Sequence, residues 1–148
     1  MSQDARHVIN ELIVELFQNI LNLEEKYHRL HGIELSMTEI HTLDSIHQSE
    51  TKHMSDVASR LNITQGTLTS TVKRLESKGY VKRVRDQEDR RVHRLQLLPA
   101  ADAVLKVHHR FHDEVVNEIL NEVEHDEKLV QAINNLNHFF KEIEKKES

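Results

Sequence analysis

Two groups of side chains in the middle of the chain have the types and spacing needed to bind a polyanion. The first lies between Gln65 and Arg74, where Leu68, Val72 and Leu75 recur at helical spacing and form an inward stripe. At about 100° per residue, the outward and flanking residues are small, hydroxylic or basic. They are Gln65, Gly66, Thr67, Thr69, Ser70, Lys73 and Arg74. Small residues allow a close approach to a major groove, and Lys and Arg can bond guanine, so this face predicts contact with duplex DNA.

The second group is the arginine pair Arg90 and Arg91, which lies in a loop between two short alternating segments, 81–85 and 92–97. Alternation of this kind predicts two strands with one buried face each. An exposed β-loop with paired arginines can enter a narrow minor groove, where the negative potential is greatest. We expect Asp89 to fix the loop by ion pairing, because a phosphate would repel its carboxylate. The alternative for both groups is an ordinary solvated surface.

The elements around these groups follow the order of a winged helix-turn-helix. A short amphipathic helix is expected from about Ser55, followed by the turn Asn62-Ile63-Thr64. Thr64 then caps the helix that begins at Gln65, and Gly79 ends it as a left-handed residue. Two strands with a charged loop complete the module, which we place at residues 36–98. The predicted fold class is mainly α with a small β-wing.

Long helices are expected on both sides of this module. Apolar residues at spacings of three and four predict a helix over 4–30 with one buried stripe, and further helices over 99–123 and 129–143. Ser36 and Glu39 form a capping box at the start of the module. We interpret the chain, 1–148, as a single domain in which 1–35 and 99–148 form a helical region for dimerisation and for a ligand pocket. The terminal helices are too few and too apolar for a second independent core.

The charge is distributed unevenly between these parts. The chain as a whole has a net charge of −5, which alone argues against nucleic-acid binding. From Lys52 to Leu97, however, 11 Lys and Arg stand against 5 Asp and Glu, a net charge of +6; the remainder has 9 basic and 20 acidic residues, or −11. Phosphate neutralisation is local, so a basic module on an acidic scaffold is typical of a DNA-binding protein.

Composition excludes several other classes of protein. The chain has no cysteine, which excludes disulfides and thiol switches and fits a reducing compartment. The first residues lack a signal peptide, and no apolar stretch is long enough for a membrane helix, so we expect a cytoplasmic protein with no membrane partner. With three glycines and no GxSxG, Walker or cofactor loop, no catalytic residues are assigned and no enzyme activity is expected.

This order of elements, together with the motif DRRVHRLQL (Asp89 to Leu97), resembles the MarR family of bacterial repressors over nearly the whole chain. The family usually continues with Leu-Thr and a downstream Gly, whereas this chain has Leu98-Pro99-Ala100-Ala101-Asp102. This departure alters the cap of the following helix. The resemblance implies a winged-helix homodimer that binds double-stranded DNA at a pseudo-palindromic operator.

Within the family the chain is similar to the FabT branch, which regulates fatty-acid biosynthesis. The similar stretches are LEEKYHRLHG (23–32), EIHTLDSI (39–46), TQGTLTSTVKRLESKGYVKRVRDQEDRRV (64–92) and VHHRFH (107–112). The resemblance implies repression of fatty-acid synthesis genes, with long-chain acyl groups on acyl carrier protein as corepressor. The candidate residues lining a ligand pocket are Leu16, Ile20, Leu23, Val107, His108 and Phe111. Simple core and dimer packing is an equally good interpretation of these residues.

The histidines support a different effector. The chain has 12 histidines, and His108 and His112 stand four residues apart on one helix, a spacing that can hold a metal ion. In zinc-responsive MarR repressors such a site combines a first-helix Glu, a second-helix His and two fifth-helix His, which resemblance places here at Glu24, His41, His108 and His112. The alternative is a polar network that orients the helices around the pocket. No resident cofactor is expected otherwise.

Overall fold

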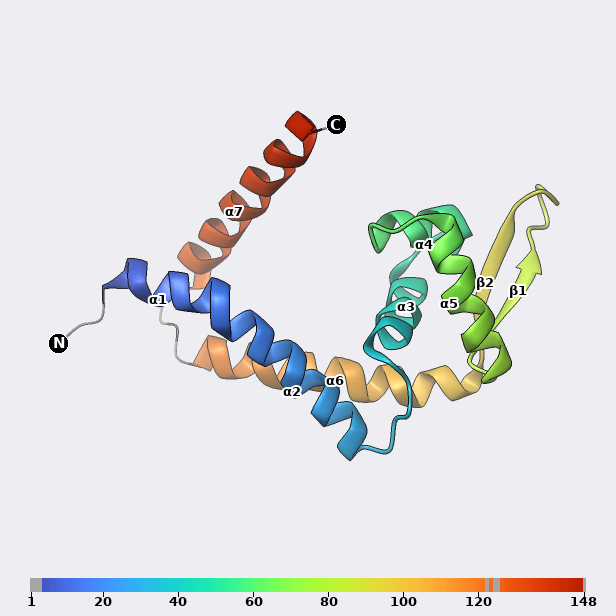
Figure 1. Ribbon diagram of the computed structural model, residues 1–148, viewed down its shortest axis with the longest axis horizontal. Helices are drawn as coiled ribbons and strands as arrows, with labels where there is room; N and C mark the ends of the chain where they lie inside the picture. The colour runs from blue at the N-terminus through green and yellow to red at the C-terminus, as the bar shows by residue number, and fades with distance from the viewer. Residues whose placement is uncertain (1–3, 122, 124–125, 148) are drawn as a thin grey trace. The chain divides into compact units, whose positions relative to one another are not determined.

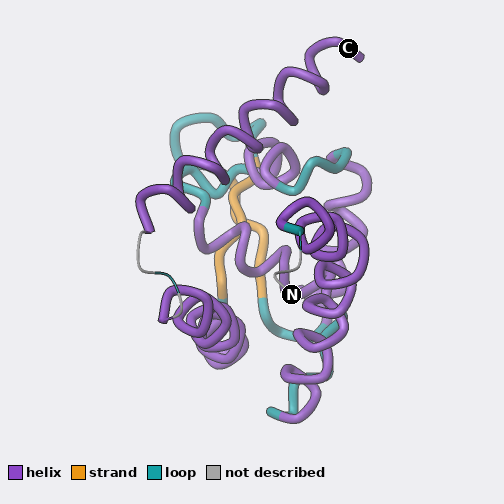
Figure 2. The backbone as a smooth tube through the Cα atoms, turned by 90° about the vertical axis from the view of Figure 1, so that its left-hand side faces the viewer, coloured by secondary structure: helices purple, strands orange, loops and turns teal. Residues whose placement is uncertain are grey.

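The computed structural model describes residues 4–121, 123 and 126–147 and divides the chain into two compact units, 1–111 and 112–148. The elements (Figure 1) are α1 (Ala5–Glu11), the π-helical segment η1 (Leu12–Leu16), α2 (Phe17–Leu30), α3 (Met37–Gln48), α4 (Met54–Arg60), α5 (Gln65–Ser77), β1 (Val81–Arg85), β2 (His93–Leu97), α6 (Pro99–Asn121) and α7 (Asp126–Glu147). The chain is therefore mainly helical with one two-stranded sheet, as Figure 2 also shows, and the predicted fold class is confirmed.

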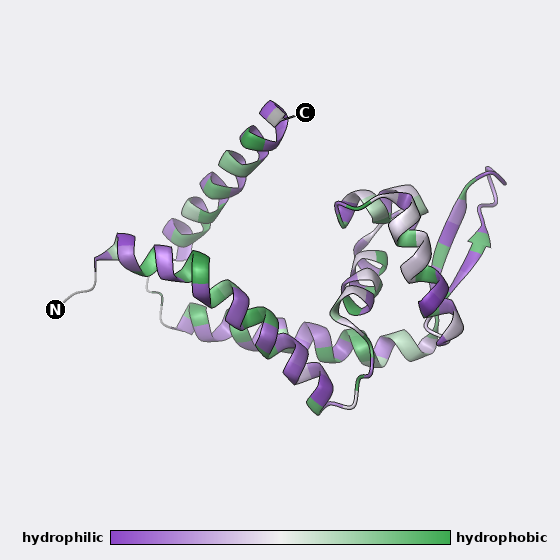
Figure 3. Ribbon diagram, in the orientation of Figure 1, coloured by the Kyte–Doolittle hydropathy of each residue, from purple (hydrophilic) through white to green (hydrophobic). Residues whose placement is uncertain are grey.

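The N-terminal helix differs from its prediction in two ways. It is interrupted by η1, whose wider π-helical turns shift the positions that follow around the axis. The predicted burial of its apolar stripe is also wrong for the single chain: Ile9, Leu12 and Ile13 are each at least half exposed. Figure 3 shows the mixture of hydrophobic and hydrophilic residues along this helix. Only Glu24 and His28 of α2 are buried, which leaves the stripe available to another surface.

The core of the DNA-binding module is built from one apolar face of each element. Ile40, Leu43 and Ile46 of α3 are completely buried and lie at the centre. The other members of the core come from α4, α5, the strands and α6: Val57, Ala58, Leu68, Val72, Leu75, Val81, Leu95, Ala101, Val104 and Leu105. Because α5 contributes its predicted stripe to this core, its opposite face is directed outward.

The turn between α4 and α5 is fixed by backbone geometry and one cap. Asn62 has a φ of 54°, in the left-handed region that Asn tolerates better than most residues. The Thr64 hydroxyl then accepts a hydrogen bond from the backbone N–H of Thr67, which begins α5 as predicted. Gly79, with a φ of 81°, follows the helix C-cap and turns the chain into β1.

The two strands pair in an antiparallel register that runs from Val81 opposite Leu97 to Arg85 opposite His93. Val81 and Leu95 are buried at the base of the sheet. The segment before α4 joins the other edge, where Leu95 donates its N–H to the carbonyl of Lys52 at 2.8 Å. The wing is therefore attached at its base to both the core and the start of α4.

The helix α6 begins at Pro99, as predicted, and its first turns belong to the module core through Ala101, Val104 and Leu105. Further along the same helix, His108 and Phe111 are also buried. In the second unit, α7 carries an exposed apolar stripe that includes Ile133, Leu136 and Phe140. Among the described residues, no helix is long and apolar enough to cross a membrane.

A buried carboxylate ties α3 to α5. The Glu39 side chain completes the predicted capping box by accepting a hydrogen bond from the Ser36 N–H at 2.9 Å. Both of its oxygens also lie 2.9 Å from Nζ of Lys78, and Nε of Arg74 is 3.6 Å away. Burial opposes ionisation, but the hydrogen bonds from Lys78 and Ser36 outweigh it and lower the pKa of Glu39.

This arrangement predicts a specific loss of stability in acid. Because folding lowers the pKa of Glu39, its ionised form stabilises the fold fully above the pH at which the unfolded carboxyl titrates, and this contribution is lost as the pH falls through the folded pKa. Glu39→Gln should lower the free energy of unfolding by about 1–3 kcal/mol at neutral pH. The variant should then lose less stability than the parent between about pH 5 and pH 3.

Denaturant unfolding at several pH values measures this effect. Glu25→Gln is the matched control, because Glu25 forms an exposed pair with Arg29 one turn away on α2, and such pairs contribute little. An acid dependence for Glu39→Gln equal to that of the parent would contradict the role given to the Lys78 pair.

Candidate nucleic-acid interface

The face of α5 opposite the core presents the residues predicted to contact DNA. Gln65, Gly66, Thr67, Ser70 and Lys73 are exposed, and Thr69 is half-buried. The hydroxyl of Thr69 donates to the Gln65 carbonyl at 2.8 Å, and that of Ser70 donates to the Gly66 carbonyl at 3.4 Å. With their protons directed back at the helix, these hydroxyls present oxygen lone pairs outward. They can therefore accept from base amino groups such as those of adenine or cytosine.

Gly66 is not required by the packing of the protein. A Cβ built at this position would meet only the Thr64 hydroxyl, at the ordinary contact distance of 3.8 Å. A glycine on an exposed helix costs stability relative to alanine. The missing side chain does, however, leave the α5 backbone open to close approach by another molecule.

The two cations of α5 have different surroundings. Lys73 is exposed, and within the described part of the chain it forms no ion pair. Arg74, in contrast, donates to the hydroxyl of Thr71 at 3.2 Å and pairs with Glu39. The guanidinium of Arg74 therefore extends toward the start of α3, at the edge of the predicted face, while Lys73 remains available to a phosphate or a base.

The loop of the wing is held by Asp86, which sequence reasoning did not single out. Its Oδ1 accepts hydrogen bonds from the N–H groups of Glu88 and Asp89 at 2.8 and 3.1 Å, and these bonds lower the pKa of Asp86. Its Oδ2 lies 3.2 Å from Nε2 of His53 and 3.7 Å from Nε of Arg94. An Asp that begins a tight turn commonly bonds the backbone two residues on, so this signal was present in the sequence.

The arginine pair extends from this anchored loop. Arg90 and Arg91 are both exposed. The Asp89 carboxylate accepts from the backbone N–H of Arg91 at 2.9 Å, and the Asp89 carbonyl accepts from Val92 at the same distance. The structure thus shows Asp89 bonded to the loop backbone, whereas the sequence prediction had it act by ion pairing. Among the described residues no ion pair engages either guanidinium group, so both are available to an outside partner.

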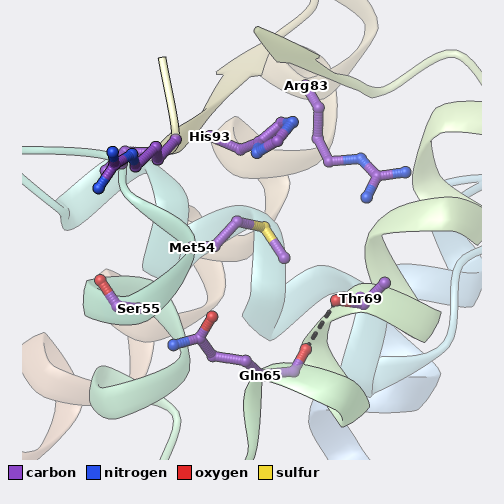
Figure 4. A pocket seen from close by; sticks show the side chains of 8 residues that line it. Met54, Ser55, Gln65, Thr69, Arg83 and His93 are labelled. Carbon is purple, nitrogen blue, oxygen red and sulfur yellow. Dashed lines mark hydrogen bonds between the residues drawn. The ribbon is translucent and has the colours of Figure 1, made fainter. Parts of the chain in front are cut away.

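A cleft of about 340 Å³ lies between α5, the start of α4 and the wing. Three of the predicted DNA-binding residues, Gln65, Thr69 and Arg91, line it. Figure 4 shows Arg83 and His93 extending into the cleft from the wing, opposite Gln65 and Thr69. Its remaining lining residues are Met54, Ser55 and Val92. Sequence reasoning missed Arg83 and His93, because only the strand register shows that both side chains lie on the face toward α5.

A second polar site lies in the first unit, where α2, α3 and the first half of α6 meet. Oε1 of the buried Glu24 lies 3.1 Å from Nδ1 of His108 and 3.4 Å from Nε2 of His41. One ligand atom from each of these residues falls within 4.8 Å of the others, so three of the four predicted metal ligands are brought together. His112, the fourth, belongs to the second unit.

Further imidazoles and a second carboxylate surround this cluster. His28 is buried; its Nδ1 lies 2.7 Å from the Glu24 carbonyl, and its Nε2 has no partner among the described residues. Asp44 lies 2.7 Å from Nε2 of His109 and 3.9 Å from Nε2 of His108. The site therefore joins α2 and α3 to α6 through polar contacts.

The predicted pocket residues are divided between surface and interior. Leu16 and Leu23 are 44% and 55% exposed in the single chain, whereas Ile20 and Val107 are half-buried. Phe111 is buried, and its ring lies 5.3 Å from that of Tyr27. Their role as a ligand pocket stays a prediction.

Comparisons with known proteins cover most of the chain and indicate its family. Residues 35–93 match the MarR family. The structure of FabT from Streptococcus pneumoniae, solved in complex with DNA, is 32% identical, with a TM-score of 0.80 over 93% of this chain and 99% of that one. The chain belongs to the MarR family. It is a DNA-binding transcriptional regulator of the MarR type, and MarR proteins are not enzymes.

Other transcriptional regulators are similar over almost the same length. The regulator SarZ from Staphylococcus haemolyticus is 27% identical over 133 residues, which cover 89% of this chain and 88% of SarZ. The structure of BldR from Sulfolobus solfataricus is 26% identical, with a TM-score of 0.60 over 90% of this chain and 97% of BldR. The similarity thus extends well beyond the DNA-binding module to the helices that flank it.

Removal of the wing arginines should weaken DNA binding without unfolding the protein. Because Arg90 and Arg91 are exposed and Asp86 anchors the loop through backbone bonds, Arg90→Ala or Arg91→Ala should leave the melting temperature unchanged. Operator binding, measured by mobility shift, should weaken by about 1–3 kcal/mol. The double variant Lys26→Ala/Arg29→Ala removes two exposed cations from α2 and serves as the charge-matched control. If the double variant Arg90→Ala/Arg91→Ala bound the operator with unchanged affinity at physiological salt, the wing would not contact DNA.

Proposed function

We propose that this protein is a homodimeric repressor of fatty-acid biosynthesis genes that acts in the cytoplasm at a pseudo-palindromic operator. We further propose that long-chain acyl groups on acyl carrier protein act as its corepressor. The observation that carries the proposal is the similarity to FabT, which extends over 93% of the chain and therefore includes the helices outside the DNA-binding module. We therefore place effector specificity in those helices.

The distribution of exposed apolar side chains supports a homodimer. Among the described residues, the large hydrophobic side chains that are strongly exposed all fall within 8–30 or 116–143, and none falls within the module. Soluble monomers rarely leave a large apolar surface exposed. A two-fold dimer through these helices would bury it and would present two modules to half-sites about one helical turn apart, roughly 34 Å.

The continuity of α6 supports a corepressor that acts from the flanking helices. Val104 and Leu105 lie in the module core, and His108 and Phe111 lie one and two turns further along the same helix. An acyl chain packed against Phe111 would therefore bear on the helix that supports the module. Lys106 and Arg110 are exposed on α6 and are the cations that we propose for docking the acidic carrier protein.

Addition of carrier protein to the purified protein and its operator tests this proposal. Long-chain acyl carrier protein should raise operator affinity by about tenfold, whereas unloaded carrier protein should not. The charge-reversed variant Lys106→Glu/Arg110→Glu should bind the operator as the parent does but should lose the response. An equal response to loaded and unloaded carrier protein would overturn the acyl specificity, and no response to either would overturn the corepressor.

A second candidate function, a zinc-responsive repressor, is favoured by the cluster of Glu24, His41 and His108. Two imidazoles and a carboxylate are a donor set that suits zinc, and ligand atoms around a tetrahedral zinc ion lie roughly 3.3 Å apart. The 3.1 and 3.4 Å separations to Glu24 fit that spacing, although the 3.4 Å contact with His41 is equally a direct hydrogen bond. We infer that Glu24, His41 and His108 would hold the ion, which would supply a charge linking α2, α3 and α6.

Native mass spectrometry of the protein after addition of zinc separates the two candidates. If zinc is the effector, one ion per protomer should be retained, and His41→Gln should lose it while it remains folded, because His41 is partly exposed. His47→Gln, a change to an exposed histidine on the same helix, is the control. If the parent and His47→Gln retained zinc and His41→Gln did not, the result would count against the lipid effector. If the parent retained no zinc after equimolar addition, the zinc candidate would be excluded.

A further inference from the structure

The cleft between α5 and the wing lies where a DNA strand must pass. In duplex DNA the major groove and the adjacent minor groove are separated by one sugar-phosphate backbone. If α5 occupies one groove and the wing loop enters the next, that backbone crosses the space between them. The cleft of about 340 Å³ opens in that space, with Gln65 and Thr69 on one side and Arg83 and His93 on the other (Figure 4).

We propose that this cleft binds a phosphate of the DNA backbone and that His93 contacts it as the charged imidazolium. The proposal rests on DNA binding by α5 and the wing, and it is independent of the effector. The lining residues suit an oxyanion: the Ser55 hydroxyl, the Gln65 amide and the guanidinium of Arg91 can all donate.

The other charged groups that line the cleft are two arginines, and one of them is already paired with a carboxylate. Arg83 donates through its backbone N–H and its Nε to Glu76 of α5, at 2.9 and 3.2 Å, so its positive charge is largely neutralised within the protein. Arg91 is permanently charged. His93 is the one histidine among the residues that line the cleft, and imidazole is the side-chain group whose charge can respond to pH near neutrality.

The His93 side chain is available for such a contact. It is exposed, and in the described part of the chain no hydrogen bond or ion pair holds its imidazole. Its cross-strand partner is Arg85, and α4 contributes the neutral Met54 and Ser55 to the cleft. The two carboxylates of the neighbouring helices are engaged elsewhere, Glu76 with Arg83 and Asp56 of α4 with the Thr51 hydroxyl. In the wing loop, Asp86 bonds to His53 and to loop N–H groups, Asp89 bonds to the N–H of Arg91, and Glu88 is exposed. Because no ion pair joins a carboxylate to the His93 imidazole in the described part of the chain, a bound phosphate would supply its anionic partner.

Proton uptake follows from this contact. A bound phosphate favours the charged form of the imidazole, so DNA binding takes up a proton at His93 wherever the free protein holds it neutral. By linkage, operator affinity must fall as the pH rises through the range in which histidine titrates. At most one proton is taken up at His93 of each protomer. Each proton taken up changes the operator affinity by at most about tenfold per pH unit.

Operator affinity measured between about pH 6 and pH 8 at constant salt tests the proposal. The parent should lose at least about threefold in affinity over this range. His93→Gln should bind more weakly at the acidic end and show a flatter profile, and His93→Arg should bind tightly with the same flat profile. His31→Gln, which changes an exposed histidine at the end of α2, should retain the parental profile.

Calorimetry of DNA binding in buffers of different ionisation enthalpy supplies a readout that a purely structural role would not change. The parent should take up protons on binding, and His93→Gln should take up fewer. Equal proton uptake and equal pH profiles for the parent and His93→Gln would overturn the role of His93 while leaving DNA binding intact. Failure of the parent and of all variants to bind DNA would instead overturn the DNA contact of α5 and the wing.

Discussion

The packing of α3 against α5 and the first turns of α6 is the constraint on which the other features depend. Ile40, Leu43 and Ile46 of α3 belong to one core with residues of α5 and of α6. Because Leu68 and Leu75 are part of that core, α5 cannot turn its polar face inward without exposing them. Full burial of one such leucine stabilises the fold by about 1.5–3 kcal/mol. The orientation of the DNA-binding face is therefore set by apolar burial, and the polar residues on it are free to serve recognition.

The same core explains how charge is arranged in the module. Three of its carboxylates, Glu39, Glu76 and Asp86, are partly or fully buried and bond to backbone N–H groups or to nearby cations. Each joins two elements: α3 to α5, α5 to β1, and the wing loop to the segment before α4. These three carboxylates thus act within the module, and Lys73, Arg90 and Arg91 remain at the surface. Within residues 52–97, whose net charge is +6, the surface available to DNA is therefore basic.

The order and bounds of the elements could be predicted because local signals determine them. The cap at Thr64, the glycine at Gly79 and the alternation around β1 and β2 all act within a few residues. Contacts between elements could not be predicted in the same way. The pairing of Arg74 with Glu39 depends on how α3 crosses α5, and the position of His93 in the cleft depends on the strand register. The π-helical turn in the first helix has no comparable signal in the sequence.

The sequence reveals the residues of the DNA-binding face more readily than those of an effector site, and the polar cluster of Glu24, His41 and His108 illustrates the reason. A DNA-binding face needs only exposed cations and small residues, which periodicity reveals. An effector site must change the relation between two elements, and here α6 provides the connection, because it carries core residues of the module and the buried His108 in adjacent turns. Burial of an ionisable pair costs free energy unless its partners stay in place. Glu24 and His108 are both almost completely buried, so a ligand that contacted both would connect α2 to α6. A metal ion and an acyl chain would thus act through one mechanical connection, and only the atoms that each ligand contacts distinguish them.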